Sequence, residues 1–414
     1  MQKGIGMIQP DLFDLVADAY GQHGDLDNHR LYREVATRAG LAEALGKKVP
    51  IGNARRMHDP LKRKIRWYQQ DLKRLGLIEH VPGKRGVWQL TEGGKHKLRK
   101  IKPDAALLAF STDLGIAIWG SCDRVFTRLE SGIALNITSV PYPLKKARAY
   151  GNPTPAEFVD FICKSMEPIV KRLIPGGSIC INVSNDIFEY NSPARSLYRE
   201  RMVIALHERL GLYKMDEIIW ENPSKPPSPV QWASIKRVQL NAGWEPIYWF
   251  TNDPYNVRAD NRRVLEPHTE RHLGLIRGGG ERRIASYSDG SYRIRIGSFS
   301  YQTEGRIPRN VIRRGHHCPD QVIYKAKARS LGLKPHGAPF PLAIVNFLIR
   351  FLTEPMELVV DQFGGSLSTA KESEILGRRW VTTDNVYDYV RGGAERFRDF
   401  PGFWLNPDFE ERIQ

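Results

Sequence analysis

The sequence predicts an α/β fold with a doubly wound, largely parallel sheet, preceded by a smaller basic domain. From about residue 134 onward, apolar strand-like segments alternate with helix-like segments, which is the pattern of layered α/β folds. Two of these strands end in turns rich in polar residues, glycine or proline, and such folds place their ligands at strand ends of this kind. The basic domain is predicted from the first 100 residues, which contain 20 Lys and Arg against 11 Asp and Glu.

Length and charge narrow the class of protein. The 414 residues suffice for two or three domains with at least one large core, so a small disulfide scaffold is excluded. Lys and Arg number 62 against 46 Asp and Glu, a net charge of +16, which favours a polyanionic partner, with nucleic acid first. No apolar run approaches the roughly 20 residues of a membrane span, so we expect no membrane partner.

The cysteines predict a reducing environment. None of the four is spaced as C-x-x-C, so neither a zinc site nor a disulfide framework is indicated. A cytoplasmic location fits this usage. The four are Cys122, Cys163, Cys180 and Cys318.

The N-terminal domain contains an amphipathic basic helix followed by a hairpin. Residues 61–75 repeat apolar side chains at helical spacing with Lys and Arg elsewhere around the helix, and Gly76 is a candidate C-cap. Two strand-like segments, 77–81 and 87–91, then flank a basic turn. This order resembles the winged-helix modules attached to DNA-processing enzymes, so we expect this domain to contact DNA. The alternative is a structural or dimerising appendage.

A basic linker at 101–103 leads into the larger domain, whose alternation is interrupted by the segment 256–315. This segment contains thirteen Arg, no Lys and the run Gly278-Gly279-Gly280. The planar guanidinium fork can pair with a guanine edge or a phosphate, so an excess of Arg alone favours recognition. The alternative is a solvated loop that neutralises phosphates without reading sequence.

Two motifs indicate the chemistry. Residues 138–142 read Thr-Ser-Val-Pro-Tyr and follow the apolar strand 134–137, so they lie at the carboxyl end of a strand. Residues 358–366 read as a buried strand that ends in an acid and a glycine-rich turn, with a helix expected over 369–376. The next strand, 380–383, is followed by Asp384, 19 residues after Gly365. At this spacing a nucleotide-binding βαβ unit places a carboxylate on a ribose hydroxyl.

Together these motifs resemble the S-adenosylmethionine-dependent DNA amino-methyltransferases, which methylate adenine N6 or cytosine N4. The S-x-P-aromatic motif precedes the cofactor loop, and the basic segment lies between them, which is similar to the permuted β-class order on a Rossmann-like sheet. Residues 220–223 resemble the family's W-x-N-P segment, and residues 336–341 resemble its H-P-A-P-F-P segment. The resemblance covers roughly residues 130–390.

The resemblance implies an organisation and a set of partners. It divides the chain into a winged-helix-like domain (1–100), a catalytic part (101–221), a target-recognition insertion (222–335) and a cofactor-binding part (336–414). Double-stranded DNA is the expected partner. A homodimer would be favoured by symmetry if the target is a palindrome.

The catalytic roles implied by the resemblance fall on one turn. The Ser139 hydroxyl and the Val140 carbonyl would accept the two hydrogens of the target amine, so that the nitrogen lone pair faces the methyl donor. Val140 replaces the first proline of the usual S-P-P-Y motif but retains this carbonyl. Pro141 would stiffen the turn, and Tyr142 would stack on a base flipped out of the duplex.

The cofactor roles fall on the second motif. Asp361 and Asp384 would hold the amino acid and ribose ends of S-adenosylmethionine, with Phe363 packed beside it. The remaining candidate cofactor residues are Gly364, Gly365, Ser366, Pro339 and Phe340. Leu367 departs from the family's glycine and carries a cost if that position needs a positive φ. We expect no metal site, because His316, His317, Cys318 and Asp320 lack tetrahedral spacing, and we expect a structural role for His336.

The target base and the reaction retain alternatives. Serine at the first motif position is commoner in the family's cytosine-N4 enzymes. Against this, Val140 departs from the usual motif sequence of those enzymes, and adenine-N6 enzymes are more numerous in the family. We therefore favour adenine N6, with cytosine N4 as the alternative. A DNA-binding regulator that no longer turns over, and a methyltransferase acting on RNA or protein, are hypotheses of other classes. No nuclease motif is visible, so in a restriction–modification pair this chain would supply the modification.

Overall fold

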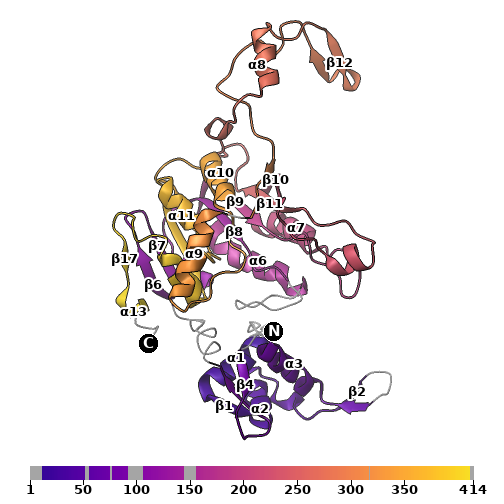
Figure 1. Ribbon diagram of the computed structural model, residues 1–414, viewed down its shortest axis with the longest axis vertical. Helices are drawn as coiled ribbons and strands as arrows, with labels where there is room; N and C mark the ends of the chain where they lie inside the picture. Colours follow the sequence, from indigo (N-terminus) through magenta and orange to yellow (C-terminus); the bar gives the residue numbers. More distant parts are fainter. Residues whose placement is uncertain are drawn as a thin grey trace, which may run out of the picture.

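The computed structural model describes residues 12–51, 56–74, 77–91, 106–143, 155–316 and 318–410. Figure 1 shows an N-terminal domain, a large α/β body and a projecting segment around α8 and β12. Within the described ranges, no helix combines the length and the apolar character needed to cross a lipid bilayer. All four cysteines are free thiols.

The N-terminal domain has the predicted helix and hairpin. Three helices surround a three-stranded antiparallel sheet in the order β1-β5-β4. On the third helix Leu61, Ile65 and Leu72 are buried, which confirms the amphipathic pattern, whereas the C-cap expected at Gly76 lies outside the described residues. The elements are α1 (Leu12–His23), β1 (Asp25–Asp27), α2 (Asn28–Arg38), α3 (Pro60–Arg74), β4 (Ile78–His80) and β5 (Val87–Leu90). The predicted basic turn joins β4 to β5.

A short hairpin that the sequence did not predict lies between α2 and α3. Its strands are β2 (Val49–Ile51) and β3 (Arg56–His58), preceded by a 3-10 turn η1 (Ala42–Ala44). Strands of three residues carry too short a hydrophobic pattern to be recognised in a sequence.

The large domain is built on a ten-stranded sheet in the order β14-β10-β11-β9-β8-β15-β16-β7-β6-β17. The five central strands, from β9 to β7, are parallel, and the pairings of β6 and β11 at either side are antiparallel. The predicted parallel sheet is therefore confirmed at its centre. The strands are β6 (Ala106–Ser111), β7 (Gly115–Gly120), β8 (Ile133–Ser139), β9 (Leu173–Asn182), β10 (Tyr213–Glu221), β11 (Trp244–Thr251), β14 (Val311–Arg313), β15 (Leu358–Asp361), β16 (Arg379–Asp384) and β17 (Trp404–Leu405).

Helices cover both faces of this sheet. Val359 and Val360, neighbours on β15, belong to different hydrophobic clusters, because successive side chains of a strand point to opposite faces. The cluster of Val360 includes α5 (Cys122–Phe126), α6 (Pro155–Val170) and α7 (Tyr198–Leu210). The opposite face is covered by α9 (Pro319–Ser330), α10 (Leu342–Leu352), α11 (Ser368–Ile375), α12 (Tyr387–Ala394) and α13 (Pro407–Glu410). This arrangement confirms the doubly wound fold.

The range predicted as an inserted recognition region, 222–335, does not form one separate body. It contains β11, which pairs with β9 and β10 in the central sheet, and α9, which packs on α12. The apolar run Ile247-Tyr248-Trp249-Phe250 explains the first difference, because these side chains are buried between the helical layers. Two parts of the range lie outside the sheet. One is the loop before β11, which contains η2 (Val230–Ile235), and the other is the segment between β11 and β14.

That second segment projects from the body (Figure 1). Its elements are η3 (Asn261–Val264), α8 (Glu270–Arg277), β12 (Ala285–Tyr287), η4 (Ser288–Gly290) and β13 (Tyr292–Ile294), with β12 and β13 forming an antiparallel hairpin. The predicted basic segment 256–315 therefore corresponds to this projection and its attachment through β14.

Candidate active site

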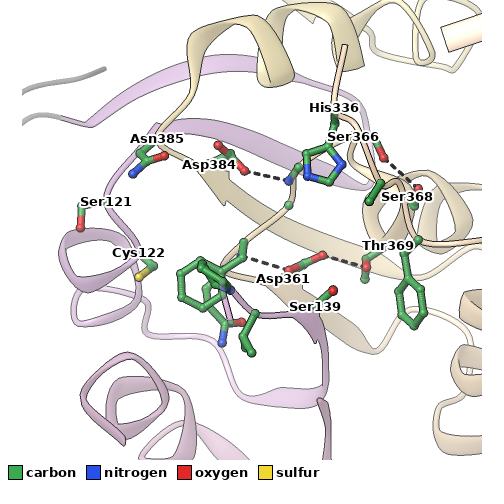
Figure 2. Close-up of a pocket in the computed structure, with 18 of the residues that line it drawn as sticks. Ser121, Cys122, Ser139, His336, Asp361, Ser366, Ser368, Thr369, Asp384 and Asn385 are labelled. Carbon is green, nitrogen blue, oxygen red and sulfur yellow. Dashed lines mark hydrogen bonds between the residues drawn. The ribbon is translucent and has the colours of Figure 1, made fainter. Parts of the chain in front are cut away.

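A pocket opens at the carboxyl ends of the central parallel strands (Figure 2). Residues that follow β7, β8, β15 and β16 line it, together with Phe161 of α6 and the segment before α10. Its empty volume is about 1100 Å³ counted out to the open mouth. Both sequence motifs meet here because parallel neighbouring strands end at the same edge of the sheet.

Eleven of the twelve candidate residues line the pocket, namely Ser139, Val140, Pro141, Tyr142, Phe340, Asp361, Phe363, Gly364, Gly365, Ser366 and Asp384. The exception is Pro339, whose carbonyl oxygen accepts a hydrogen bond from Gln321 Nε2 at 3.3 Å. Sequence reasoning missed the turn Gly120-Ser121-Cys122-Asp123 and Asn385, which also line the pocket. The apolar stretch Gly115–Gly120 contains the necessary signal, because the same strand-end rule applies to it.

Ser139 is held by a residue on the neighbouring strand. Its Oγ donates to Asn182 Oδ1 at 3.2 Å, and Asn182 Nδ2 donates to the carbonyl oxygen of Pro246 at 3.3 Å. The second bond fixes which end of the amide faces Ser139. The Ser139 hydroxyl therefore donates its proton to Asn182, and the lone pairs of Ser139 Oγ are available to accept hydrogen bonds from a ligand.

Val140 and Tyr142 differ in burial. The Val140 side chain is part of the hydrophobic core beneath the motif, so valine anchors the turn where the family usually has proline. Tyr142 is half-buried, packs against the edge of the same core and lines the pocket. A half-buried aromatic ring can offer one face to a planar ligand.

Both carboxylate oxygens of Asp361 accept hydrogen bonds from its own chain. Oδ1 accepts from Thr138 Oγ1 at 2.9 Å and from the Phe363 amide at 3.1 Å, and Oδ2 accepts from Thr369 Oγ1 at 2.9 Å. Burial raises the pKa of Asp361 to about 6, and these hydrogen bonds lower it only in part. Asp361 therefore fixes the start of the glycine-rich loop to β8 and α11.

Asp384 occupies the equivalent place at the end of β16. Its Oδ2 accepts from the Gly365 amide at 2.8 Å (Figure 2). Its Oδ1 accepts from the Val386 amide at 2.8 Å. Burial raises the pKa of Asp384 to about 6. Each oxygen retains a further lone pair, so this carboxylate can accept hydrogen bonds from a ligand as well.

The glycine-rich loop is tightly enclosed. A Cβ on Gly364 would lie 2.3 Å from Thr382 Oγ1, so only glycine fits there. Leu367 has a φ of +63°, which meets the condition stated from the sequence for a conformational cost. Its side chain is fully buried against Gly393, and this burial offsets the cost.

The lining suits S-adenosylmethionine. Three carboxyl groups, those of Asp123, Asp361 and Asp384, line the pocket, and no Lys or Arg occurs among its described lining residues. S-adenosylmethionine carries a positive sulfonium and an ammonium group, which such a lining favours. Phe161, Phe340 and Phe363 supply apolar and aromatic surface for the rest of the ligand.

Comparison with known families decides the class of protein. The sequence profile of the DNA methylase family matches residues 133–395, a range that contains both motifs and the whole pocket except the turn after β7. The chain belongs to this family of N6 and N4 DNA methylases. A second profile, that of the Mrr N-terminal domain, matches residues 11–100 of the methylase.

Individual relatives agree with this assignment. The type II methyltransferase M.PvuII of Proteus hauseri is 31% identical over 292 residues, covering 70% of this chain and 86% of the relative. The type II methyltransferase M.BglII of Bacillus subtilis is 22% identical over 262 residues, covering 63% and 62% of the two chains. The solved structure of the cytosine-N4-specific PvuII DNA methyltransferase superposes with a TM-score of 0.55 at 26% identity, over 73% of this chain and 93% of that one.

The methylase is therefore a site-specific DNA amino-methyltransferase that uses S-adenosylmethionine. The resemblance and the Rossmann-like fold expected from the sequence are confirmed. The expected preference for adenine has no support from these comparisons, because the solved relative is cytosine-N4-specific.

Proposed function

We propose that the methylase transfers a methyl group to the N4 amine of a cytosine that it flips out of duplex DNA. The similarity to M.PvuII and to the solved cytosine-N4-specific enzyme supports cytosine over adenine. Serine at the first position of the catalytic motif, Ser139, supports the same base. Because both relatives are type II methyltransferases, a restriction–modification role is proposed with it.

The hydrogen bond from Ser139 to Asn182 carries the catalytic proposal. An aromatic exocyclic amine is a weak nucleophile because its lone pair is delocalised into the ring. With its own proton donated to Asn182, Ser139 Oγ accepts one amine hydrogen, and the Val140 carbonyl accepts the other. Both bonds draw the nitrogen toward tetrahedral geometry with its lone pair directed at the donor.

When bound, S-adenosylmethionine would supply the sulfonium methyl group for N4, with its sulfur–carbon bond broken and one amine proton released to water. Asp384 would accept hydrogen bonds from the ribose, Phe363 would pack beside the ligand, and Asp361 would hold the loop that contains Gly364 to Ser366. Tyr142 would stack on the flipped cytosine and offset part of the cost of unstacking it.

Two surfaces are proposed to contact the duplex. In the basic segment 256–315, which includes the projection and its attachment, six exposed arginines make no ion pair within the described residues: Arg271, Arg282, Arg293, Arg295, Arg309 and Arg314. On α3 of the N-terminal domain, Arg63, Lys64, Arg66, Trp67 and Lys73 are exposed. Cations on a helix face beside an exposed tryptophan match a phosphate backbone. Replacing Arg63, Lys64 and Arg66 by Ala should reduce the salt dependence of duplex binding.

The base is identified by its product. The full-length methylase is incubated with S-adenosylmethionine and mixed-sequence duplex DNA, the DNA is digested to nucleosides, and these are analysed by mass spectrometry. The proposal expects N4-methylcytosine. N6-methyladenine would overturn the choice of base, and the absence of both products despite cofactor binding in calorimetry would overturn the proposed activity.

A further inference from the structure

Helix α9 contributes no lining residue to the pocket, yet its side chains bind two segments that do line it. The helix is the next element after β14, where the projecting segment returns to the sheet. It packs on α12 and is bonded to α11 through Lys371. These contacts come from the first two turns of the helix. They concern Asp320, Gln321 and Tyr324.

Gln321 and Tyr324 fix the segment that precedes α10. Gln321 Nε2 donates to the carbonyl oxygens of Pro339 and Phe340, at 3.3 and 3.2 Å. The Tyr324 hydroxyl accepts from the His336 amide at 2.9 Å. Both side chains are buried, so these bonds are shielded from water. They place the His336 ring beside Gly365, where a Cβ would approach the ring to 3.4 Å.

Asp320 acts on the glycine-rich loop through Arg396. One guanidinium nitrogen of Arg396 donates to the Asp320 carboxylate, and another donates to the carbonyl oxygen of Ser366. The Arg396 side chain is only 2% exposed and its guanidinium lies over the Tyr324 ring at 5.6 Å. Lys371 of α11 donates to the second carboxylate oxygen of Asp320. Burial acts to raise the pKa of Asp320, but the charges of Arg396 and Lys371 outweigh it, and the pKa is lowered.

The hydrogen bond from Arg396 to the Ser366 carbonyl meets the loop between two residues with left-handed backbone. Gly365 has a φ of +52° and Leu367 a φ of +63°, so both neighbours of Ser366 are left-handed. A leucine rarely adopts this conformation unless its surroundings enforce it. Arg396 supplies such a constraint, because its planar fork bonds the loop and Asp320 with a fixed angle between them.

We propose that Arg396 is a positioning residue that holds the Ser366 carbonyl, and with it the glycine-rich loop, in the conformation that binds S-adenosylmethionine. Asp320 of α9 fixes the guanidinium from the other side. Arg396 does not line the pocket, so it acts on the cofactor only through the loop. The proposal concerns cofactor binding alone and does not depend on which base is methylated.

The test compares Arg396→Lys with a matched arginine. A lysine keeps the charge but cannot bond Asp320 and Ser366 with one planar group. We expect the dissociation constant for S-adenosylmethionine, measured by calorimetry without DNA, to rise about 10- to 100-fold, the effect of losing a charged hydrogen bond. Arg391→Lys is the control: Arg391 is 3% exposed, pairs with Glu395 at 2.6 Å and Glu410 at 3.1 Å, and lies outside the pocket lining.

Thermal unfolding of both variants separates positioning from general stability. The proposal expects similar losses of melting temperature but weakened cofactor binding in Arg396→Lys alone, with duplex affinity within about twofold of the unaltered chain in both. Unchanged cofactor affinity in Arg396→Lys, or equal weakening in Arg391→Lys, would overturn it. If Arg396→Lys does not fold, Asp320→Asn takes its place. This variant removes the charge that fixes the guanidinium and should weaken cofactor binding about 10-fold, whereas unchanged binding would overturn the proposal.

Discussion

Ser139 and Asn182 are register partners on adjacent parallel strands, and the Ser139 hydroxyl donates to the Asn182 side-chain oxygen at 3.2 Å. Each residue is the last of its strand, β8 or β9, so the pair lies at the edge of the sheet where the pocket opens. Asn182 is itself oriented by its bond to Pro246 of β11. The central sheet thus determines the direction in which the serine proton points.

Ser139→Ala tests the acceptor role of the hydroxyl. Without it one amine hydrogen loses its acceptor, and we expect the single-turnover rate of methyl transfer to fall about 100-fold, as when one oriented hydrogen-bonding group is removed from an active site. Cofactor affinity should be unchanged, because Asp361, Asp384 and the glycine-rich loop are untouched. A rate within threefold of the unaltered enzyme would contradict the role.

Tyr142 is tested by separating its ring from its hydroxyl. Tyr142→Phe keeps the stacking surface and should retain most of the activity. Tyr142→Ala should lose about 1–3 kcal/mol of base stacking, a 5- to 150-fold lower rate at saturating cofactor. A mismatch at the target base lowers the cost of flipping and should partly restore the rate of the alanine variant. Equal rates in the two variants would exclude stacking.

The raised pKa of Asp384 predicts a pH dependence of cofactor binding. Its pKa is about 6 in the folded protein, so the carboxyl ionises as the pH rises through 6 and is largely neutral below it. A cationic cofactor prefers the ionised form, so the affinity for S-adenosylmethionine should rise between pH 5 and 7. Calorimetry across this range checks the direction. Asp361 titrates near the same pH, so Asp384→Asn should flatten the profile in part and weaken binding at pH 7.5.

The arginines of the projecting segment fall into two classes, those that pair with an acidic residue and those that make no ion pair within the described residues. Arg282 and Arg293 are exposed and free of ion pairs within the described residues, so Arg282→Ala and Arg293→Ala should each cost about 1–3 kcal/mol at one position of the target and relax the preference there. Arg262, which pairs with Asp260 at 2.8 Å, supplies the control. Binding to a library of duplexes measures the effect. Uniform weakening across all sequences would identify the arginines as phosphate contacts.

The sequence predicted those features that depend on local pattern. The strands that end at Ser139 and Asp361 are buried and largely apolar, and the polar turns at their ends converge because parallel strands end at one edge. Leu367, where the sequence departs from the family's glycine, has the positive φ that such a departure makes costly. The end of α11 before Gly377 is predicted by that glycine as a capping residue, and the β4–β5 hairpin of the N-terminal domain is predicted by the residues of its turn.

Features that depend on pairing between distant segments could not be predicted. Asn182 lies 43 residues from Ser139, and only the register of β8 with β9 brings them together. The apolar strand β11 was included in the recognition region because a sequence does not reveal an antiparallel partner. Likewise Pro339 turns its carbonyl toward Gln321, a contact that requires α9 to be in place.

The most direct test of the catalytic account is the single-turnover rate of Asn182 variants. Asn182→Asp keeps an oxygen to accept the Ser139 proton, whereas Asn182→Leu has a similar size and removes it. We predict a smaller fall in rate for Asn182→Asp, which loses the bond to Pro246 but keeps an acceptor for Ser139, and a fall of about 30- to 100-fold for Asn182→Leu with cofactor affinity and folding retained. Full activity of Asn182→Leu would contradict the claim that Asn182 makes Ser139 an acceptor.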